Sequence, residues 1–390
     1  MKIKSLLLGS AAAMLAVSGA SAADAIIAAE PEPVEYVRVC DAFGAGYFYI
    51  PGTETCLKIS GFVRMDLGFA SDTDSYTSTV RGRVNFQAKE DTELGVLHAY
   101  VRLQGDSSPS DGVFDPNDPI GPTDNLNNGA AYDAGVVLDQ AYAELGGLIF
   151  GYTETTWVSS KNGGASGFGS HSDNGLAYGY SQANQIGYNF TGGNWFAAIS
   201  ANDDGDASTY MPDITGRVGG VFAGATVYLA GGYDQSAENF GLKLGLNTDI
   251  GPAGNLIVQG FYADGPSRYG ANASPVGVAA INGLGVATTH TPEWSILASY
   301  QHQFAPNFKA SIGGQYSSDY YVVPLAGTAP LGSANSGIDS WAVEGVLVWN
   351  PVENLEVRGE VRYTDFQSSA AVGYLGGDST TGLFRLQRNF

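Results

Sequence analysis

Seven arginines of this chain lie between apolar residues or glycines in segments whose side chains alternate in character. Arg64, for example, stands between Val63 and Met65. Such alternation places the guanidinium groups on one face of a β-strand and the apolar side chains on the other. A guanidinium stays charged and binds carboxylates through several donors, so these residues offer electrostatic chemistry. The set is Arg64, Arg81, Arg83, Arg102, Arg358, Arg362 and Arg385.

Signatures of enzymatic or metal chemistry are missing from the sequence. It contains no G-x-S-x-G, P-loop or H-E-x-x-H motif, and its four histidines lack the spacing of metal ligands. Residues 202–206 and 115–118 resemble fragments of a calcium loop without its distal Glu, and we interpret them as solvated acidic loops. We therefore expect no enzyme activity, no cofactor and no metal site.

The strands that must position the arginines recur from residue 57 to the carboxy-terminus. The last residues show the pattern, with Phe384, Leu386 and Phe390 on one face and Arg385 and Gln387 on the other. About sixteen antiparallel strands, with short turns at one end and longer loops at the other, predict an all-β transmembrane barrel. Seven short turns rich in Gly, Pro or Asn are expected near residues 91–93, 146–147, 191–194, 223–224, 251–254, 305–307 and 350–354.

A barrel in lipid has to be closed, because an open sheet edge would leave backbone groups unpaired. The last strand then pairs with the first, and the seven arginines lie on five consecutive strands at one side of the lumen. Trp341 and Trp349 share one face of a predicted strand. Their spacing along the membrane normal is roughly 20 Å for a strand tilted by about 40°, which suits the two headgroup levels of one apolar band.

The amino-terminal residues predict export. Two lysines precede an apolar run and the motif Ala-Ser-Ala ends at Ala22, so we interpret residues 1–22 as a signal peptide. In an exported chain, the two cysteines Cys40 and Cys56 are expected to form a disulfide. The expected organisation is a leader, an amino-terminal segment with the disulfide (23–56) and a transmembrane barrel (57–390).

Net charge restricts the partners of this chain. The formal charge of −21 argues against nucleic acid, and it favours a weak preference for cations. Apart from the leader, no stretch of about 20 apolar residues predicts a transmembrane helix.

Four segments of the sequence resemble one family of proteins. Residues 56–66 (Cys-Leu-Lys-Ile-Ser-Gly-Phe-Val-Arg-Met-Asp) resemble the first strand of bacterial general porins, and residues 141–151 resemble the porin segment that leads into the third loop. The cysteine-bounded run 34–56 and the end, 384–390, are similar to the alphaproteobacterial outer-membrane porin family. The cysteine-bounded run is the most specific of these motifs.

This resemblance implies a sixteen-stranded trimeric barrel in the bacterial outer membrane, with a water-filled channel for passive diffusion of small hydrophilic solutes and ions. It implies that the third loop, from about residue 154 to 182, folds inward and narrows the pore. Glu154 and Asp173 on this loop would then face or flank the arginines, and opposed charges across a narrow pore favour polar solutes. The implied partners are the other subunits of a homotrimer, outer-membrane lipid, lipopolysaccharide and the solutes.

Alternatives stay open for the arginines and for the whole chain. The arginines could pair with acids such as Asp66 and Glu360 and hold the wall together, with or without a role in selectivity. The barrel could have a structural or adhesion role with its lumen plugged by the cysteine-bounded segment. A barrel enzyme would need a Ser–His or Asp–His pair near the outer rim. The direction of Arg388 is also open, because many barrels have an aromatic or apolar residue at that position.

Overall fold

The computed structural model describes most of the chain beyond residue 37. Apart from Arg38, the described residues belong to one compact unit, Val39–Phe390. None of them forms a helix that is long and apolar enough to cross a membrane. The predicted leader lies outside the described residues, which are 38–71, 75–109, 132–133, 135–158, 170–173, 175–205, 210–271, 286–324, 334–370 and 374–390.

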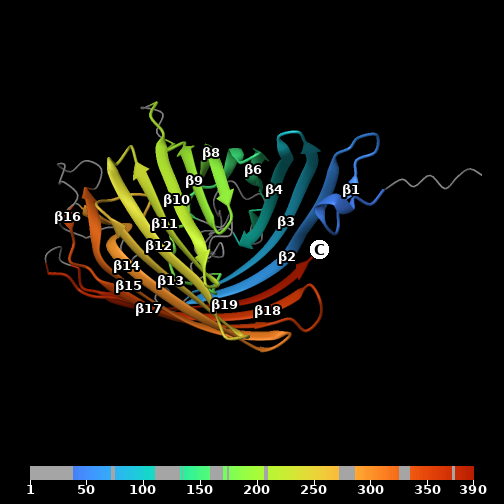
Figure 1. The fold of residues 1–390 in the computed structure, drawn as a ribbon. Helices are drawn as coiled ribbons and strands as arrows, with labels where there is room; N and C mark the ends of the chain where they lie inside the picture. The colour runs from blue at the N-terminus through green and yellow to red at the C-terminus, as the bar shows by residue number, and fades with distance from the viewer. Residues whose placement is uncertain are drawn as a thin grey trace, which may run out of the picture. The chain divides into compact units, whose positions relative to one another are not determined.

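Sixteen strands among the described residues form one closed antiparallel sheet (Figure 1). The ring closes where β19 pairs with β2, from Thr381 opposite Ala70 to Asn389 opposite Phe62. The seven predicted short turns all join consecutive strands, which confirms the predicted transmembrane β-barrel. The sixteen strands are β2 (Cys56–Ala70), β3 (Ser75–Thr92), β4 (Gly95–Pro109), β6 (Val136–Leu145), β7 (Leu148–Glu154), β8 (Gln182–Gly192), β9 (Trp195–Asn202), β10 (Asp213–Phe222), β11 (Ala225–Asp234), β12 (Asn239–Ile250), β13 (Gly254–Ala263), β14 (Val286–Ala305), β15 (Phe308–Pro324), β17 (Ser340–Trp349), β18 (Leu355–Phe366) and β19 (Gly377–Asn389).

Short elements complete the described part of the chain. A 3-10 helix, η1 (Asp41–Phe43), precedes the first pairing of the sheet. Three two-residue strands attach to the ring: β1 pairs with β2, β5 with β4 and β16 with β15. They are β1 (Phe48–Tyr49), β5 (Tyr132–Asp133) and β16 (Ala334–Asn335).

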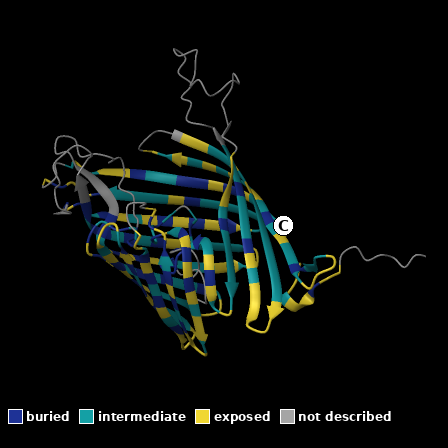
Figure 2. Ribbon diagram, turned by 90° about the horizontal axis from the view of Figure 1, so that it is seen from above, coloured by how far each residue is buried: buried dark blue, intermediate teal, exposed yellow. Residues whose placement is uncertain are grey.

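Side chains alternate between two faces along the strands. On β12, Leu242 and Leu244 are 41% and 57% exposed, whereas Lys243 between them is 1% exposed. Figure 2 shows this alternation of exposed and buried positions along several strands. The exposed large apolar side chains of the strands therefore point outward, where lipid surrounds a barrel, and the polar side chains between them point into the lumen. A few apolar side chains, such as Phe261 beside Lys243, also point inward.

The outer face contains both tryptophans of the predicted membrane band and also Arg388. Trp341 and Trp349 are half-exposed on β17, on the same face, as the alternation predicts. Arg388 is exposed on the outer face of β19, opposite Val63 of β2 and close to the carboxy-terminus. Its long side chain suits the headgroup level at the end of a strand. Arg388 is therefore not part of the lumen wall.

The described amino-terminal residues pack against the short-turn end of β2 and β3. Cys40 and Cys56 form the predicted disulfide and are buried together with Tyr47. Closing a loop of this length stabilises a fold by about 3 kcal/mol in the chain-entropy treatment. The Tyr47 hydroxyl donates to Oε1 of the inward-facing Gln87 at 3.0 Å, which fastens the segment to the lumen side of the rim. Strand β2 itself begins at Cys56.

Candidate functional site

The seven arginines lie on β18, β19, β2, β3 and β4, which are consecutive in the closed ring. Arg64 stands opposite Arg81 across the β2–β3 pair, and Arg358 stands opposite Arg385 across the β18–β19 pair. All of the seven except Arg362 line an open cavity of about 760 Å³. We call this cavity the charged passage. Ring closure brings arginines from both ends of the chain to one side of it.

Carboxylates bind the arginines of β3 and β4. Arg81 donates from Nε and Nη2 to the two carboxylate oxygens of Asp106, at 2.5 and 2.7 Å. Arg83 and Arg102 share Asp139, at 3.5 and 3.3 Å. Among the described residues, six arginines and five carboxylate side chains line the charged passage, so its wall has a formal charge of +1. The wall is therefore densely charged but nearly neutral.

Asp173 joins the connection between β7 and β8 to this wall. We call this connection, residues 155–181, the third connection. The Asp173 carboxylate forms ion pairs with Arg385 and with Arg64, the latter at 3.4 Å, and Arg385 also binds both oxygens of Asp66. Burial alone would raise the pKa of Asp173, but the nearby Arg385 guanidinium outweighs it and holds this pKa below its usual range. The pairing is thus complete at neutral pH and is lost only as strong acid protonates the carboxylate.

The other two members of the predicted site have different surroundings. Glu154 is the last residue of β7 and lines the charged passage together with Asp173. Arg362 instead lines a second cavity, of about 340 Å³, and its Nη1 donates to the carbonyl oxygen of Gly175 at 2.5 Å. The structure thus places Arg362 against the backbone of the third connection, apart from the other six arginines.

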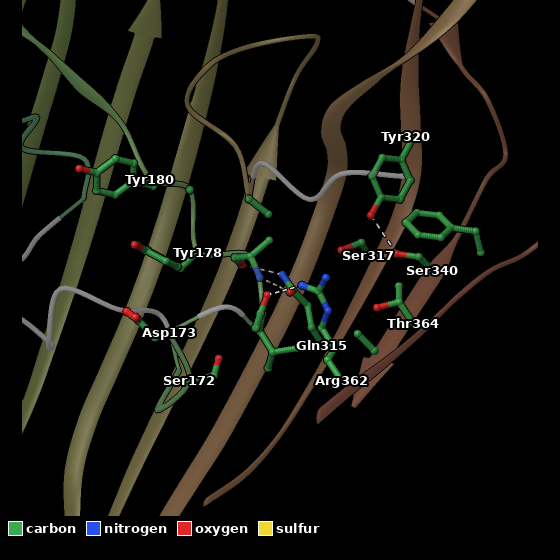
Figure 3. A pocket seen from close by; sticks show the side chains of 17 residues that line it. Ser172, Asp173, Tyr178, Tyr180, Gln315, Ser317, Tyr320, Ser340, Arg362 and Thr364 are labelled. Atoms are coloured by element: carbon green, nitrogen blue, oxygen red, sulfur yellow. Dashed lines mark hydrogen bonds between the residues drawn. The ribbon is translucent and has the colours of Figure 1, made fainter. Parts of the chain in front are cut away.

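Side chains of the barrel wall hold the third connection through its backbone. Oε1 of Glu360 accepts from the Asp173 amide at 2.9 Å, and Oε2 of Glu344 accepts from the Leu176 amide at 3.1 Å. The Gln315 side chain accepts from the amide of Ala177 and donates to its carbonyl, each at 2.8 Å. Figure 3 shows Gln315 and Arg362 reaching the connection from the strands. The backbone groups that these wall side chains bind lie 138 to 187 positions away along the chain.

Lys243 on β12 holds the two ends of the third connection together. Its ammonium group donates to the carbonyl oxygens of Trp157 at 2.8 Å and of Tyr178 at 3.0 Å. The same ammonium lies 4.5 Å from the ring centroid of Trp157 and 5.4 Å from that of Phe261, within the range of cation–π attraction. Lys243 was not among the site residues predicted from the sequence, although a lone lysine at an inward position of a predicted strand was a visible signal.

Glycine at position 179 lets the third connection approach the segment that follows β13 closely. Its φ is +75°, and a Cβ there would collide with the carbonyl oxygen of Gly270. The Gly179 amide donates to the carbonyl of Ala271 at 2.8 Å. Any larger residue would strain this backbone and push the connection away from its neighbours.

Comparisons with known proteins agree with this architecture. Residues 24–383 match the family model described as the porin subfamily. The chain is 38% identical to porin Omp2b of Brucella abortus (strain 2308), over 67% of this chain and 74% of that protein. It is 32% identical to the putative outer membrane protein y4fJ of Sinorhizobium fredii, over 100% of this chain and 99% of that protein.

Two solved structures share the fold at low sequence identity. The outer membrane channel DcaP of Acinetobacter baumannii has a TM-score of 0.59 at 13% identity, covering 88% of this chain and 99% of that one. The anion-selective porin from Comamonas acidovorans has a TM-score of 0.54 at 14% identity, covering 86% of this chain and 100% of that one. Because a family model matches nearly the whole chain and its strands close a barrel, the chain belongs to the porin subfamily and forms a channel of the bacterial outer membrane.

Proposed function

We propose that small hydrophilic solutes and ions cross the membrane through the charged passage. The observation that carries this proposal is the lining of the cavity, where six arginines of the strands meet Asp173, Tyr178 and Tyr180 of the third connection. Closely spaced charges of both signs orient water in a narrow lumen. A polar solute exchanges its hydration for such surroundings at low cost, whereas an apolar solute does not.

The third connection is inferred to narrow the lumen. Its partners include Arg64 on β2 and Lys243 on β12, which lie in distant parts of the ring. A segment that inward-facing side chains hold from different sides lies across the enclosed space. In this arrangement Glu154 and Asp173 supply carboxylates to the constriction, and the arginines supply the positive charge opposite and beside them.

Swelling of proteoliposomes in sugars of graded size tests whether the passage is open. We expect swelling that is faster than in protein-free liposomes and that slows steadily as the sugar grows. Heat-unfolded protein in the same lipid is the control. A swelling rate equal to that of protein-free liposomes for every sugar would favour the alternative of a plugged lumen with a structural or adhesion role.

A homotrimer is proposed from the distribution of aromatic residues on the outer face. The exposed large apolar side chains on β4 and β6 are aliphatic, including Leu97 and Leu138, and Ala99 and Ala141 leave that surface flat. Lipid-facing barrel surfaces have aromatic girdles. We therefore infer that another subunit covers the outer face of β4 and β6, and that lipid and lipopolysaccharide contact the remaining outer face. A solved structure of OmpT of Vibrio cholerae is described as a trimer form. The mass of the detergent-extracted protein by light scattering should equal three chains, and a monomer mass would contradict the assignment.

The enzymatic alternative requires a histidine paired with a serine or an aspartate. The His171 side chain, which is hydrogen-bonded to Ser299 and Asn255, is the pair to consider. His171 Nδ1 lies 2.8 Å from the Ser299 hydroxyl and Nε2 lies 2.9 Å from Oδ1 of Asn255. Burial lowers the pKa of His171, so the ring is neutral at pH 7, donates from Nε2 and accepts from Ser299. Ser299 is only 1% exposed, which prevents it from acting as a nucleophile on a solute. These contacts therefore support an anchoring role for His171 in the third connection.

A further inference from the structure

The cavity of about 340 Å³ beside the charged passage differs from it in chemistry. It lies between the third connection and strands β15, β17 and β18, and Figure 3 shows its lining. The two cavities share Asp173, Tyr178 and Tyr180 as common wall. A solute in one cavity therefore lies next to the other. We call the smaller cavity the hydroxyl pocket.

Neutral hydrogen-bonding groups dominate the hydroxyl pocket. Its hydroxyl groups come from three serines, one threonine and three tyrosines, and its amide from Gln315. Its two charged residues already have partners in the protein: Asp173 pairs with Arg385, and Arg362 donates to the carbonyl oxygen of Gly175, which also lines the pocket. The hydroxyl-bearing residues are Ser172, Ser317, Ser340, Thr364, Tyr178, Tyr180 and Tyr320.

Thr364 presents the most available of these hydroxyl groups. Ser317 and Ser340 are bonded to Ser295 and to Tyr320, at 2.9 and 2.8 Å. Among the described residues, no hydrogen bond to the Thr364 side chain is found, and that side chain is half-buried at the pocket wall. A hydroxyl in that position can both donate to and accept from a solute.

Aromatic rings stand beside these hydroxyl groups. Tyr178 and Tyr180 pack edge to face, with ring centroids 6.2 Å apart, and Tyr320 packs against Phe366 at 5.6 Å. Aromatic faces pack against the C–H surfaces of a sugar ring, while hydroxyl groups bond to its OH groups. An ion gains little here, because Asp173 is paired with Arg385 and the charge of Arg362 lies near the carboxylates of Glu344 and Glu360.

We propose that the hydroxyl pocket is a binding subsite for uncharged polyhydroxylated solutes of about the size of a monosaccharide. The pocket provides an uncharged binding site next to a passage whose charges favour ions. The inference rests on the proposed channel, and it adds a solute class that the charged passage alone does not select.

The test is a titration of single-channel conductance with D-glucose in planar bilayers, with polyethylene glycol of similar mass as the control for viscosity. With glucose, we expect conductance to fall along a saturating curve as the concentration rises. With the polymer, we expect conductance to fall only as the viscosity of the solution increases. The double variant Thr364→Val with Ser340→Ala removes two hydroxyl groups of the pocket. It should raise the half-saturating glucose concentration about fivefold or more, since each hydrogen bond contributes about 1 kcal/mol.

The matched control is Thr226→Val, which removes a threonine hydroxyl from the same face of β11 as the buried Tyr228, at a position outside the described lining of either cavity. It should leave the glucose titration unchanged. Equal titrations of the double variant and Thr226→Val, or a purely viscous response of the wild type, would overturn the subsite while leaving the channel intact. A protein without conductance in any solution would contradict the channel and the subsite together.

Discussion

Replacing Lys243 by methionine should widen the channel and make its current noisier. The substitution keeps the length of the side chain but removes the two hydrogen bonds to the carbonyls of Trp157 and Tyr178. A hydrogen bond from a charged group contributes about 1.5–3 kcal/mol, so the ends of the third connection lose a large part of their attachment. We expect higher single-channel conductance and faster liposome swelling with larger sugars.

Lys309→Met is the matched control for Lys243→Met. Lys309 also points into the lumen and lines a cavity near His171, so its replacement removes the same charge without touching the carbonyls of Trp157 and Tyr178. Both variants should retain heat-modifiable migration on gels, because neither lysine side chain takes part in the strand pairing that closes the barrel. Equal conductance and equal noise in the two variants would show that Lys243 does not set the constriction.

Replacing Arg81 and Arg83 by glutamine should shift the reversal potential toward the equilibrium potential of the cation. The described wall of the charged passage has six arginines and five carboxylates, so losing two positive charges reverses its sign. A unit charge about 8 Å from an ion contributes about 2 kcal/mol at an effective dielectric constant of 20. We therefore expect the ratio of cation to anion permeability to rise about tenfold or more, measured in planar bilayers under a salt gradient.

Arg388→Gln provides the control, because it removes an arginine from the exposed outer face of β19. Asp203→Asn adds a second control in an exposed loop. Salt screens such exposed charges within about 8 Å at physiological ionic strength, so both changes should leave the reversal potential almost unaltered. If they shift selectivity as much as the pair Arg81 and Arg83 does, the arginines serve the wall structurally and the assignment of the charged passage is wrong.

The carboxylates that bind the arginines of β3 and β4 show where sequence patterns fail. Asp66 and Glu360, on strands with regular alternation, could be named from the sequence as wall acids, whereas Asp139 on β6 could not. A register shift between Arg102 and Leu103 interrupts the β4–β6 pairing, and three successive apolar residues, 136–138, precede Asp139. A period of two cannot indicate which face a residue occupies beyond such an irregularity.

Local patterns in the sequence determined the barrel. Side chains alternate in character along Cys56–Ala70 and the other barrel strands because each strand lies between lipid and water. Turns rich in Gly and Asn mark the ends of the strands. The number of strands, the turns and the closure of the barrel could therefore all be predicted. The disulfide between Cys40 and Cys56 was likewise predictable from an isolated pair of cysteines in an exported chain.

Only the tertiary structure decided which wall side chains hold the third connection. Lys243 binds carbonyl oxygens 86 and 65 positions earlier in the chain, and Glu360 binds an amide 187 positions away. Backbone carbonyls and amides are common to nearly all residues, so such partners leave no mark in composition or spacing. The linings of the charged passage and the hydroxyl pocket therefore depend on which wall side chains contact the third connection, and no local pattern encodes those contacts.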